Sequence, residues 1–94
     1  MGDMDRIRWQ CRRGLLEMDL ILQRFLAEDF DSLTPDELVL FKELLGEVDT
    51  VLLAWVMGQE EAPRRYGALI QRMQRQYRRD LQIDVLHKIY NLSN

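Results

Sequence analysis

Cysteine and histidine are almost missing from this chain of 94 residues, in which Cys11 and His87 are the only examples. A single cysteine excludes an internal disulfide, and such usage is typical of a reducing compartment. A four-ligand zinc site built from cysteine and histidine is excluded as well. Long apolar runs are also missing: none approaches the roughly 20 residues that a membrane-spanning helix needs. We therefore expect no direct insertion into a membrane.

The first residues lack the features of a cleaved targeting segment. Asp3 and Asp5 are acidic where a signal or transit peptide would be basic, and no apolar segment follows them. We therefore expect a cytoplasmic protein of bacterial type; an organelle protein after processing would look similar. The length allows one domain with a modest core. An apolar share of 47% beside a charged share of 31% favours a folded globular chain over a disordered one.

Charge is distributed unevenly along the sequence. Residues 1–62 carry 6 Lys/Arg and 14 Asp/Glu, a balance of −8. Residues 63–94 carry 7 and 2, a balance of +5, and the two parts sum to the net charge of −3. Domains that bind nucleic acid as a whole are usually strongly basic, so the acidic first part disfavours that class.

Helical periodicity dominates the sequence and predicts an all-α fold, a compact five-helix bundle in a single domain. The predicted helices occupy residues 4–12, 15–27, 35–45, 50–57 and 63 onward. Asp49 or Thr50 is expected to cap the fourth helix. We expect the helical domain to span residues 1–80, with 81–94 forming a C-terminal tail or an extension of the last helix.

The helix ends follow from a few local signals. Thr34 and Glu37 have the spacing of a capping box, with Pro35 between them at the first helical position. Gly14 is predicted to end the first helix in the left-handed conformation, which glycine adopts without steric cost. Apolar stripes at helical spacing predict the core, with Leu15, Met18, Leu22 and Phe25 in the second helix and Tyr66, Leu69, Ile70, Met73 and Tyr77 in the fifth.

The segment around Gly14 is the candidate functional site. A glycine flanked by charged residues is hard to explain by core packing, and it indicates a rigid platform for a partner. Arg13 would present a cation, Gly14 bare backbone and Glu17 a carboxylate; for Glu17 a role as helix cap is the other interpretation. Exposed Trp and Arg often anchor interfaces, so the predicted partner-binding set also includes Arg8, Trp9, Arg12 and Asp19.

No residue pattern predicts a catalytic, cofactor-binding or metal site. Glu17 and Asp19 lie two positions apart on a helix and point about 200° from each other, so they cannot act as a pair. The acids around Phe30 lack the glycine and the ligand spacing of a calcium loop. Cys11 is expected to be a packed thiol. The chain is thus predicted to be a binding module and not an enzyme.

The fifth helix offers an alternative site. Arginines line one of its faces, and a solvated face is the simplest interpretation. Phosphates of nucleic acid or of an anionic membrane surface would use the same spacing, although no aromatic residues are interleaved on that face. An antitoxin-like or cell-division regulator that uses the Arg-Gly platform on another protein is a third option. The arginines concerned are Arg65, Arg72, Arg75 and Arg79.

Four segments carry a resemblance to a known family. The first, residues 6–19, contains an Arg-Gly-x-x-Glu motif at Arg13, Gly14 and Glu17, with Trp-x-Cys before it. The other segments are residues 29–37, with the sequence Asp-Ser-Leu-Thr, 41–45 and 49–58. In this order and with short gaps, they resemble the succinate dehydrogenase flavinylation (assembly) factor family of bacteria and mitochondria.

The resemblance implies a five-helix protein that binds the flavoprotein subunit of succinate dehydrogenase, with fumarate reductase as a second candidate client in bacteria. It implies that the factor promotes covalent attachment of FAD to a histidine of the client without supplying a catalytic base. FAD would be the client's cofactor, with none held tightly by this chain. Arg13, Gly14 and Glu17 should contact the client. We expect a monomer that does not bind nucleic acid.

Overall fold

The computed structural model describes residues 2–81, which fold into five α-helices and three short helical turns. In chain order the elements are α1 (Asp3–Gln10), α2 (Leu16–Glu28), the 3-10 turn η1 (Phe30–Ser32), α3 (Pro35–Leu44), α4 (Asp49–Val56), the 3-10 turn η2 (Arg64–Tyr66), α5 (Gly67–Gln76) and the π-helical turn η3 (Tyr77–Leu81). The all-α, five-helix, single-domain prediction is confirmed for these residues. Residues 82–94 of the predicted tail lie outside the described residues.

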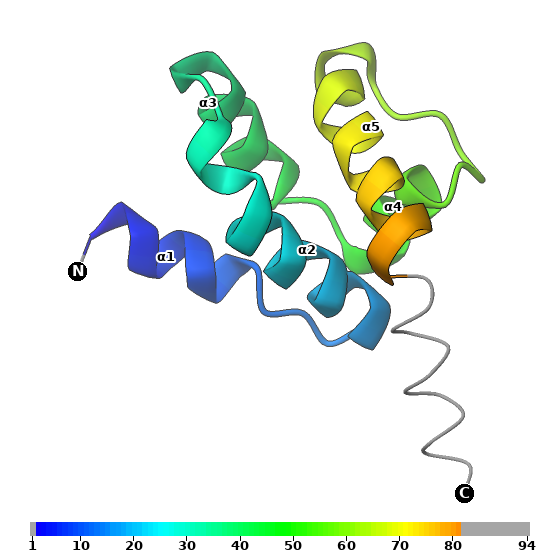
Figure 1. The fold of residues 1–94 in the computed structure, drawn as a ribbon, viewed down its shortest axis with the longest axis horizontal. Coiled ribbons are helices and arrows are strands. Elements are labelled where there is room, and N and C mark those ends of the chain that lie inside the picture. Colours follow the sequence, from blue (N-terminus) through cyan, green and yellow to red (C-terminus); the bar gives the residue numbers. More distant parts are fainter. Residues whose placement is uncertain (1, 82–94) are drawn as a thin grey trace, which may run out of the picture.

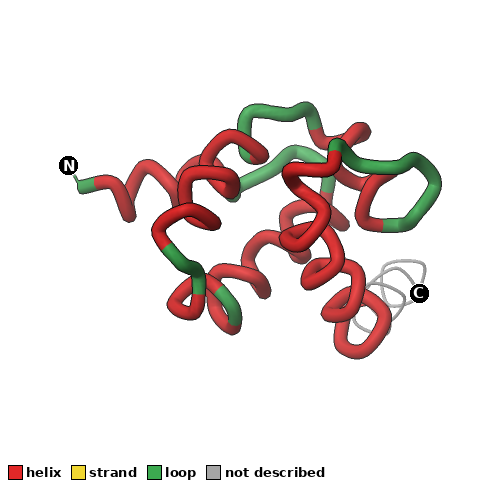
Figure 2. The backbone as a smooth tube through the Cα atoms, turned by 90° about the horizontal axis from the view of Figure 1, so that it is seen from above, coloured by secondary structure: helices red, strands yellow, loops and turns green. Residues whose placement is uncertain are grey.

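The helices pack around α2, which contacts both α4 and α5. In Figure 1, α3 and α5 lie above α2, and α4 lies beside the lower part of α5. Figures 1 and 2 both show α1 extending from this body toward the N-terminal end. The α1 helix therefore lies at the edge of the body and reaches the core through Ile7, which is 3% exposed.

The core forms where the apolar stripes of the helices meet. Phe25 of α2 stacks on Phe41 of α3 with ring centroids 5.1 Å apart. Trp55 of α4 lies next to Tyr66, at 6.0 Å between centroids. The predicted stripe of the fifth helix is confirmed, because all of its members are buried: Tyr66, Leu69, Ile70, Met73 and Tyr77. Periodicity thus identified the buried face correctly.

The capping box at the start of α3 is confirmed. The Glu37 backbone N–H donates to Thr34 Oγ1 at 3.1 Å, and the Thr34 N–H donates to Glu37 Oε1 at 2.9 Å. The hydrogen bond from the Thr34 backbone is the main cause that lowers the pKa of the Glu37 carboxyl. At the other end of the next helix, Gly58 follows α4 with φ of 77°, a conformation that favours glycine.

Replacing Thr34 with alanine should lower the free energy of unfolding by about 0.5–2 kcal/mol, because the Glu37 N–H loses its acceptor. Urea unfolding followed by circular dichroism would measure the change. Thr50→Ala is the matched control, since Thr50 is an exposed threonine in the first turn of α4 and no side-chain cap is present there. Equal stability losses in both variants would contradict a capping role.

The predicted left-handed Gly14 is wrong. The α1 helix already ends at Gln10, and among residues 2–81 only Gly58 has a positive φ. The last turn closes through backbone bonds from Cys11 N–H to Ile7 O and from Arg12 N–H to Trp9 O. Since the helix ends on these bonds, Gly14 is not its terminator and belongs to the connection that follows.

Candidate functional site

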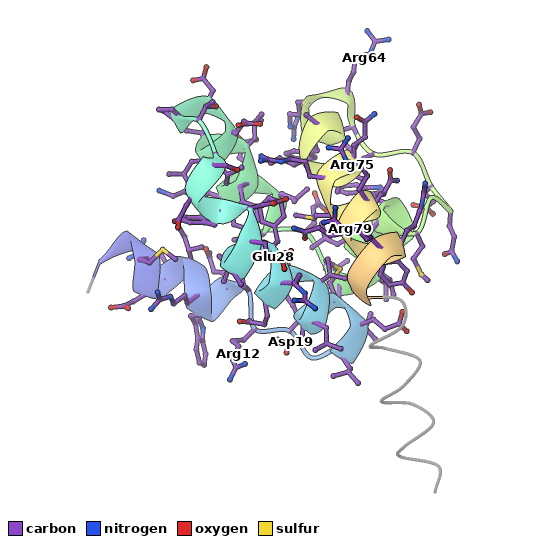
Figure 3. All side chains as sticks on the ribbon, viewed as in Figure 1. Arg12, Asp19, Glu28, Arg64, Arg75 and Arg79 are labelled. Carbon is purple, nitrogen blue, oxygen red and sulfur yellow. The ribbon has the colours of Figure 1, made fainter. Side chains whose placement is uncertain are left out.

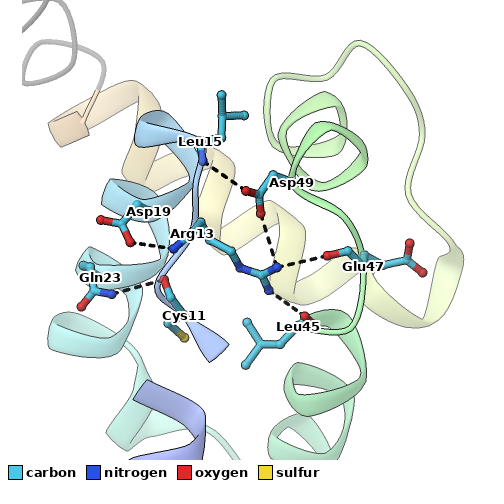
Figure 4. Close-up of polar contacts among 8 residues, drawn as sticks. All are labelled: Cys11, Arg13, Leu15, Asp19, Gln23, Leu45, Glu47 and Asp49. Atoms are coloured by element: carbon cyan, nitrogen blue, oxygen red, sulfur yellow. Dashed lines mark hydrogen bonds and ion pairs between the residues drawn. The ribbon is translucent and has the colours of Figure 1, made fainter. Parts of the chain in front are cut away.

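The candidate site is built on residues 11–15, which we call the corner segment because it joins α1 to α2. Two side chains of α2 hold its backbone: Asp19 Oδ1 accepts from the Arg13 N–H at 2.9 Å, and Gln23 Nε2 donates to Cys11 O at 3.2 Å. Figure 3 labels Arg12 and Asp19 in the lower part of the view, and Figure 4 shows the two hydrogen bonds from α2. The corner segment therefore has a fixed path despite being non-helical.

The Arg13 side chain points into the domain. Its Nη2 donates to Leu45 O at 2.7 Å, and its Nη1 donates to Glu47 O at 3.2 Å and lies 3.3 Å from Asp49 Oδ1 (Figure 4). Only 13% of the side chain is exposed, and the buried Nε atom has no hydrogen-bond partner among residues 2–81. We call this arrangement the Arg13 clamp. It ties the corner segment to the turn between α3 and α4.

Asp49 serves a different helix from the one predicted. The N-cap of α4 is Val48, which makes no side-chain cap bond, and Asp49 is the first helical residue. The Asp49 carboxylate instead accepts from the Leu15 N–H at 3.2 Å, at the start of α2, and pairs with Arg13. The prediction that Asp49 or Thr50 caps α4 is therefore wrong, and Asp49 stabilises α2 in its place.

Glu17 is half-buried near the start of α2. The capping interpretation holds in part: no side-chain cap bond is present, but the Glu17 charge lies in the first turn of α2, where it complements the helix dipole. The Tyr77 hydroxyl has a raised pKa, mainly through burial and further through the negative charge of Glu17. Glu17 thus faces the end of α5, on the side of α2 that packs against η3.

Gly14 leaves open space at the middle of the corner segment. The residue is exposed, and a Cβ built on it would meet no atom within 4 Å apart from its chain neighbours. No feature of the free domain therefore requires glycine at this position. The absence of a side chain leaves bare backbone that a partner can approach closely.

Three of the predicted residues share a groove between α1 and α2. Trp9 is 78% exposed, which is unusual for so large an apolar side chain, and Arg8 and Arg12 lie exposed on either side of it in the sequence. The groove has a volume of about 650 Å³, and it is lined by Met4, Asp5, Arg8, Trp9, Arg12, Gln23, Leu26 and Ala27. The predicted set thus separates into four exposed residues, Arg8, Trp9, Arg12 and Gly14, and three half-buried ones, Arg13, Glu17 and Asp19.

Cys11 is fully buried in the corner segment. Desolvation raises the pKa of its thiol from 9.0 to about 12, against the opposing charge of Arg13. Since the thiolate is the reactive form, this cysteine is not a nucleophile near neutral pH. The prediction of a packed thiol is confirmed.

The native protein should resist alkylation of Cys11 by iodoacetamide at pH 8, whereas the urea-unfolded chain should react fully; mass spectrometry would measure both. The raised pKa of the Cys11 thiol also makes the stability of the native state depend on pH. The unfolded thiol ionises near 9.0 and the native thiol near 12, so the native state binds this proton more tightly. Its contribution to stability is present below pH 9.0 and is lost as the pH rises to about 12. Rapid alkylation of the native protein at pH 8 would contradict the burial and the raised pKa of Cys11.

The arginines of the fifth helix are largely committed to the domain itself. Arg72 lies 3.8 Å from Asp29 and 3.7 Å from Glu37. Arg65 lies 3.5 Å from Glu43 and stacks on the Tyr66 ring at 4.7 Å. Internal pairing of this kind does not favour a phosphate-binding face. Within residues 2–81 no helix has both the length and the apolar character to cross a bilayer, and no three His, Cys, Asp or Glu side chains gather as metal ligands.

The comparisons with known proteins point to one family. The family model described as flavinator of succinate dehydrogenase matches residues 5–77. The chain is 49% identical over 59 residues to the FAD assembly factor SdhE of Legionella pneumophila (strain Lens), covering 63% of this chain and 75% of that protein. Over 53 residues it is 53% identical to that of Vibrio cholerae, covering 56% of this chain and 62% of that protein. No solved structure matches it significantly.

Proposed function

Because the chain belongs to the succinate dehydrogenase flavinator family, we propose that it is an assembly factor that promotes attachment of FAD to the flavoprotein subunit of succinate dehydrogenase. The observation that carries the proposal is the family match over residues 5–77, which includes the whole corner segment and every residue of the Arg13 clamp. The resemblance inferred from the sequence is confirmed. The alternative of a nucleic-acid or membrane-surface module gains no support.

We propose that the client docks on the groove of α1 and α2 and on the exposed backbone at Gly14. An exposed tryptophan beside arginines has the composition of an interface hot spot, and Trp9 lies in such a setting with Arg8 and Arg12. Open space at Gly14 allows a partner's backbone to come close. The half-buried Glu17 carboxylate can accept charge-assisted hydrogen bonds that fix the orientation.

Arg13 fits a positioning role better than a direct one. A client contact for Arg13 stays a prediction, but its guanidinium already binds Leu45 O, Glu47 O and Asp49. Through this clamp the side chain fixes the path of the corner segment and with it the place of Gly14. Arg13 would thus affect client binding indirectly, by fixing the position of the Gly14 backbone.

Flavin attachment requires a client histidine aligned with the flavin and charge stabilised on the flavin, which is a matter of positioning and preorganised electrostatics. A rigid partner supplies both if it binds one client conformation better than the others. This chain would then contribute binding energy and no reacting group, and FAD would be the client's cofactor. The inert Cys11 thiol supports that division of roles.

Co-expression with a flavoprotein subunit tests the proposed function. Covalent flavin on the subunit, read as in-gel fluorescence after denaturation, should appear with this chain and drop sharply without it. A subunit that acquires the same flavin without this chain would overturn the proposal.

Trp9→Ala should weaken binding to the flavoprotein subunit by about 2 kcal/mol or more, roughly 30-fold in Kd. Stability should hardly change, because the side chain is 78% exposed. Isothermal titration would give the Kd. Val39→Ala, which removes another exposed apolar side chain from α3 at 57% exposure, is the matched control. A Kd unaffected by Trp9→Ala would place the client elsewhere.

A further inference from the structure

Two exposed apolar residues lie beside the Arg13 clamp, next to the hydrogen bond that joins the starts of α2 and α4. Leu16 is 44% exposed and follows Leu15, whose N–H donates to the Asp49 carboxylate at 3.2 Å (Figure 4). Val48 is 61% exposed and precedes Asp49. Within residues 2–81, neither side chain belongs to the core or to the partly buried apolar residues packed against it. We call Leu16 and Val48 the apolar pair.

Val48 does not stabilise its own helix. It is the N-cap of α4, with the extended backbone usual at this position (φ −74°, ψ 153°), and it makes no side-chain cap bond. Ser, Thr, Asp and Asn are preferred at an N-cap because their side-chain oxygen accepts from an N–H of the first turn, and valine has no such oxygen. Val48 therefore contributes neither burial nor a cap to the free domain, and its side chain is available to a partner.

The apolar pair continues the surface that we propose for client docking. Gly14, with its exposed backbone, lies two residues before Leu16. The Arg13 clamp and the bond between Leu15 and Asp49 hold the immediate neighbours of the pair in place. Both exposed side chains are therefore attached to fixed backbone, and a preorganised contact of this kind loses little conformational entropy on binding.

The charges next to the apolar pair indicate the chemistry of the partner. An acidic residue adjoins each member, Glu17 after Leu16 and Glu47 before Val48, and both acids are half-buried. Their carboxylates favour a partner that carries a basic group beside its apolar side chain. The same carboxylates disfavour a second copy of this chain, because a symmetric contact through the pair would bring acidic residues against each other.

We propose that the apolar pair is a second anchor for the flavoprotein subunit and takes an apolar side chain of the subunit that has a basic residue beside it. This inference rests on the proposed function, and it adds a contact to those at the Trp9 groove and the Gly14 backbone. Such an anchor explains a valine at the N-cap of α4. A capping residue there would stabilise the helix, but it would place a polar group in the apolar contact.

Val48→Thr tests the anchor, because threonine has nearly the shape of valine and adds a hydroxyl that can cap α4. The urea midpoint of the free chain should rise, while the Kd for the flavoprotein subunit, measured by isothermal titration, should increase about tenfold. Val39→Thr is the matched control, since Val39 is 57% exposed in the interior of α3, where a hydroxyl completes no cap. Leu16→Ala should also increase the Kd about tenfold.

The inference fails alone if Trp9→Ala weakens binding but Val48→Thr and Val39→Thr leave the same Kd as the unmodified chain. If the unmodified chain does not bind the subunit, the proposed function fails together with the inference. Two further results would overturn the second anchor by showing another occupant. One is self-association of the free chain in sedimentation that Val48→Thr removes, which would indicate a second copy. The other is a change in the amide resonances of residues 82–94 in Val48→Thr, which would indicate the C-terminal segment of the same chain.

Discussion

Gly14→Arg is expected to abolish binding to the flavoprotein subunit while leaving the helical fold intact. The free domain tolerates a side chain there, because Gly14 is exposed, does not have a positive φ, and a Cβ would meet no atom within 4 Å. A docked client has no such space if its backbone approaches the glycine. The arginine side chain would then hold the two surfaces apart and remove most of the interface.

A pull-down with the flavoprotein subunit and a circular dichroism spectrum would test this pair of expectations. Gly67→Arg is the matched control, since Gly67 lies at the start of α5 and likewise has no atom within 4 Å of a built Cβ. Gly14→Ala should keep or slightly raise stability, by up to about 1 kcal/mol. Normal client binding by Gly14→Arg would remove the corner segment from the interface.

Arg13→Ala is expected to lower the free energy of unfolding by about 2–4 kcal/mol. The variant would leave Leu45 O without its side-chain donor and would remove the cation beside Asp49 Oδ1, in a site where only 13% of the Arg13 side chain and 22% of the Asp49 side chain are exposed. Urea unfolding would measure the loss. Arg12→Ala, at the exposed neighbouring position, should cost less than about 0.5 kcal/mol. Similar losses at both positions would show that the clamp contributes little.

Asp49→Asn separates a positioning role of Arg13 from a client contact. If Arg13 acts through the clamp, Asp49→Asn and Arg13→Ala should both reduce covalent flavin on the client, since both loosen the corner segment. If Arg13 touches the client, Arg13→Ala alone should reduce it. Flavin that is unchanged in Asp49→Asn and lost in Arg13→Ala would therefore overturn the positioning role.

Much of the fold was predictable because its determinants are local. The capping box at Thr34 depends on residues three positions apart, and the buried stripe of α5 depends on helical spacing. The fourth helix, predicted over residues 50–57, lies at Asp49–Val56 and is followed by Gly58 with a positive φ. In each case the residues that decide the structure are neighbours in the sequence, and a pattern within one window is enough to identify them.

The geometry of the candidate site was not predictable in the same way, because its bonds join distant residues. Arg13 binds carbonyls 32 and 34 positions away, and Leu15 N–H finds Asp49 across 34 positions. The motif indicated that Arg13 matters without indicating that it points inward. The error at Gly14 has a related cause: side chains of α2 form hydrogen bonds with the backbone of the corner segment, so its path does not require a left-handed glycine. The one local signal for the role of Asp49 was its place directly after Val48, whose side chain cannot cap a helix.

The two tryptophans lie in opposite environments, Trp9 at 78% exposure and Trp55 at 7%. A water-exposed indole emits at longer wavelength and is quenched readily by dissolved ions, whereas an enclosed indole is shielded from them. The protein thus carries two intrinsic fluorescent reporters, Trp9 on the surface that we propose for client docking and Trp55 in the interior. Client docking and unfolding can be followed separately in the same unlabelled sample.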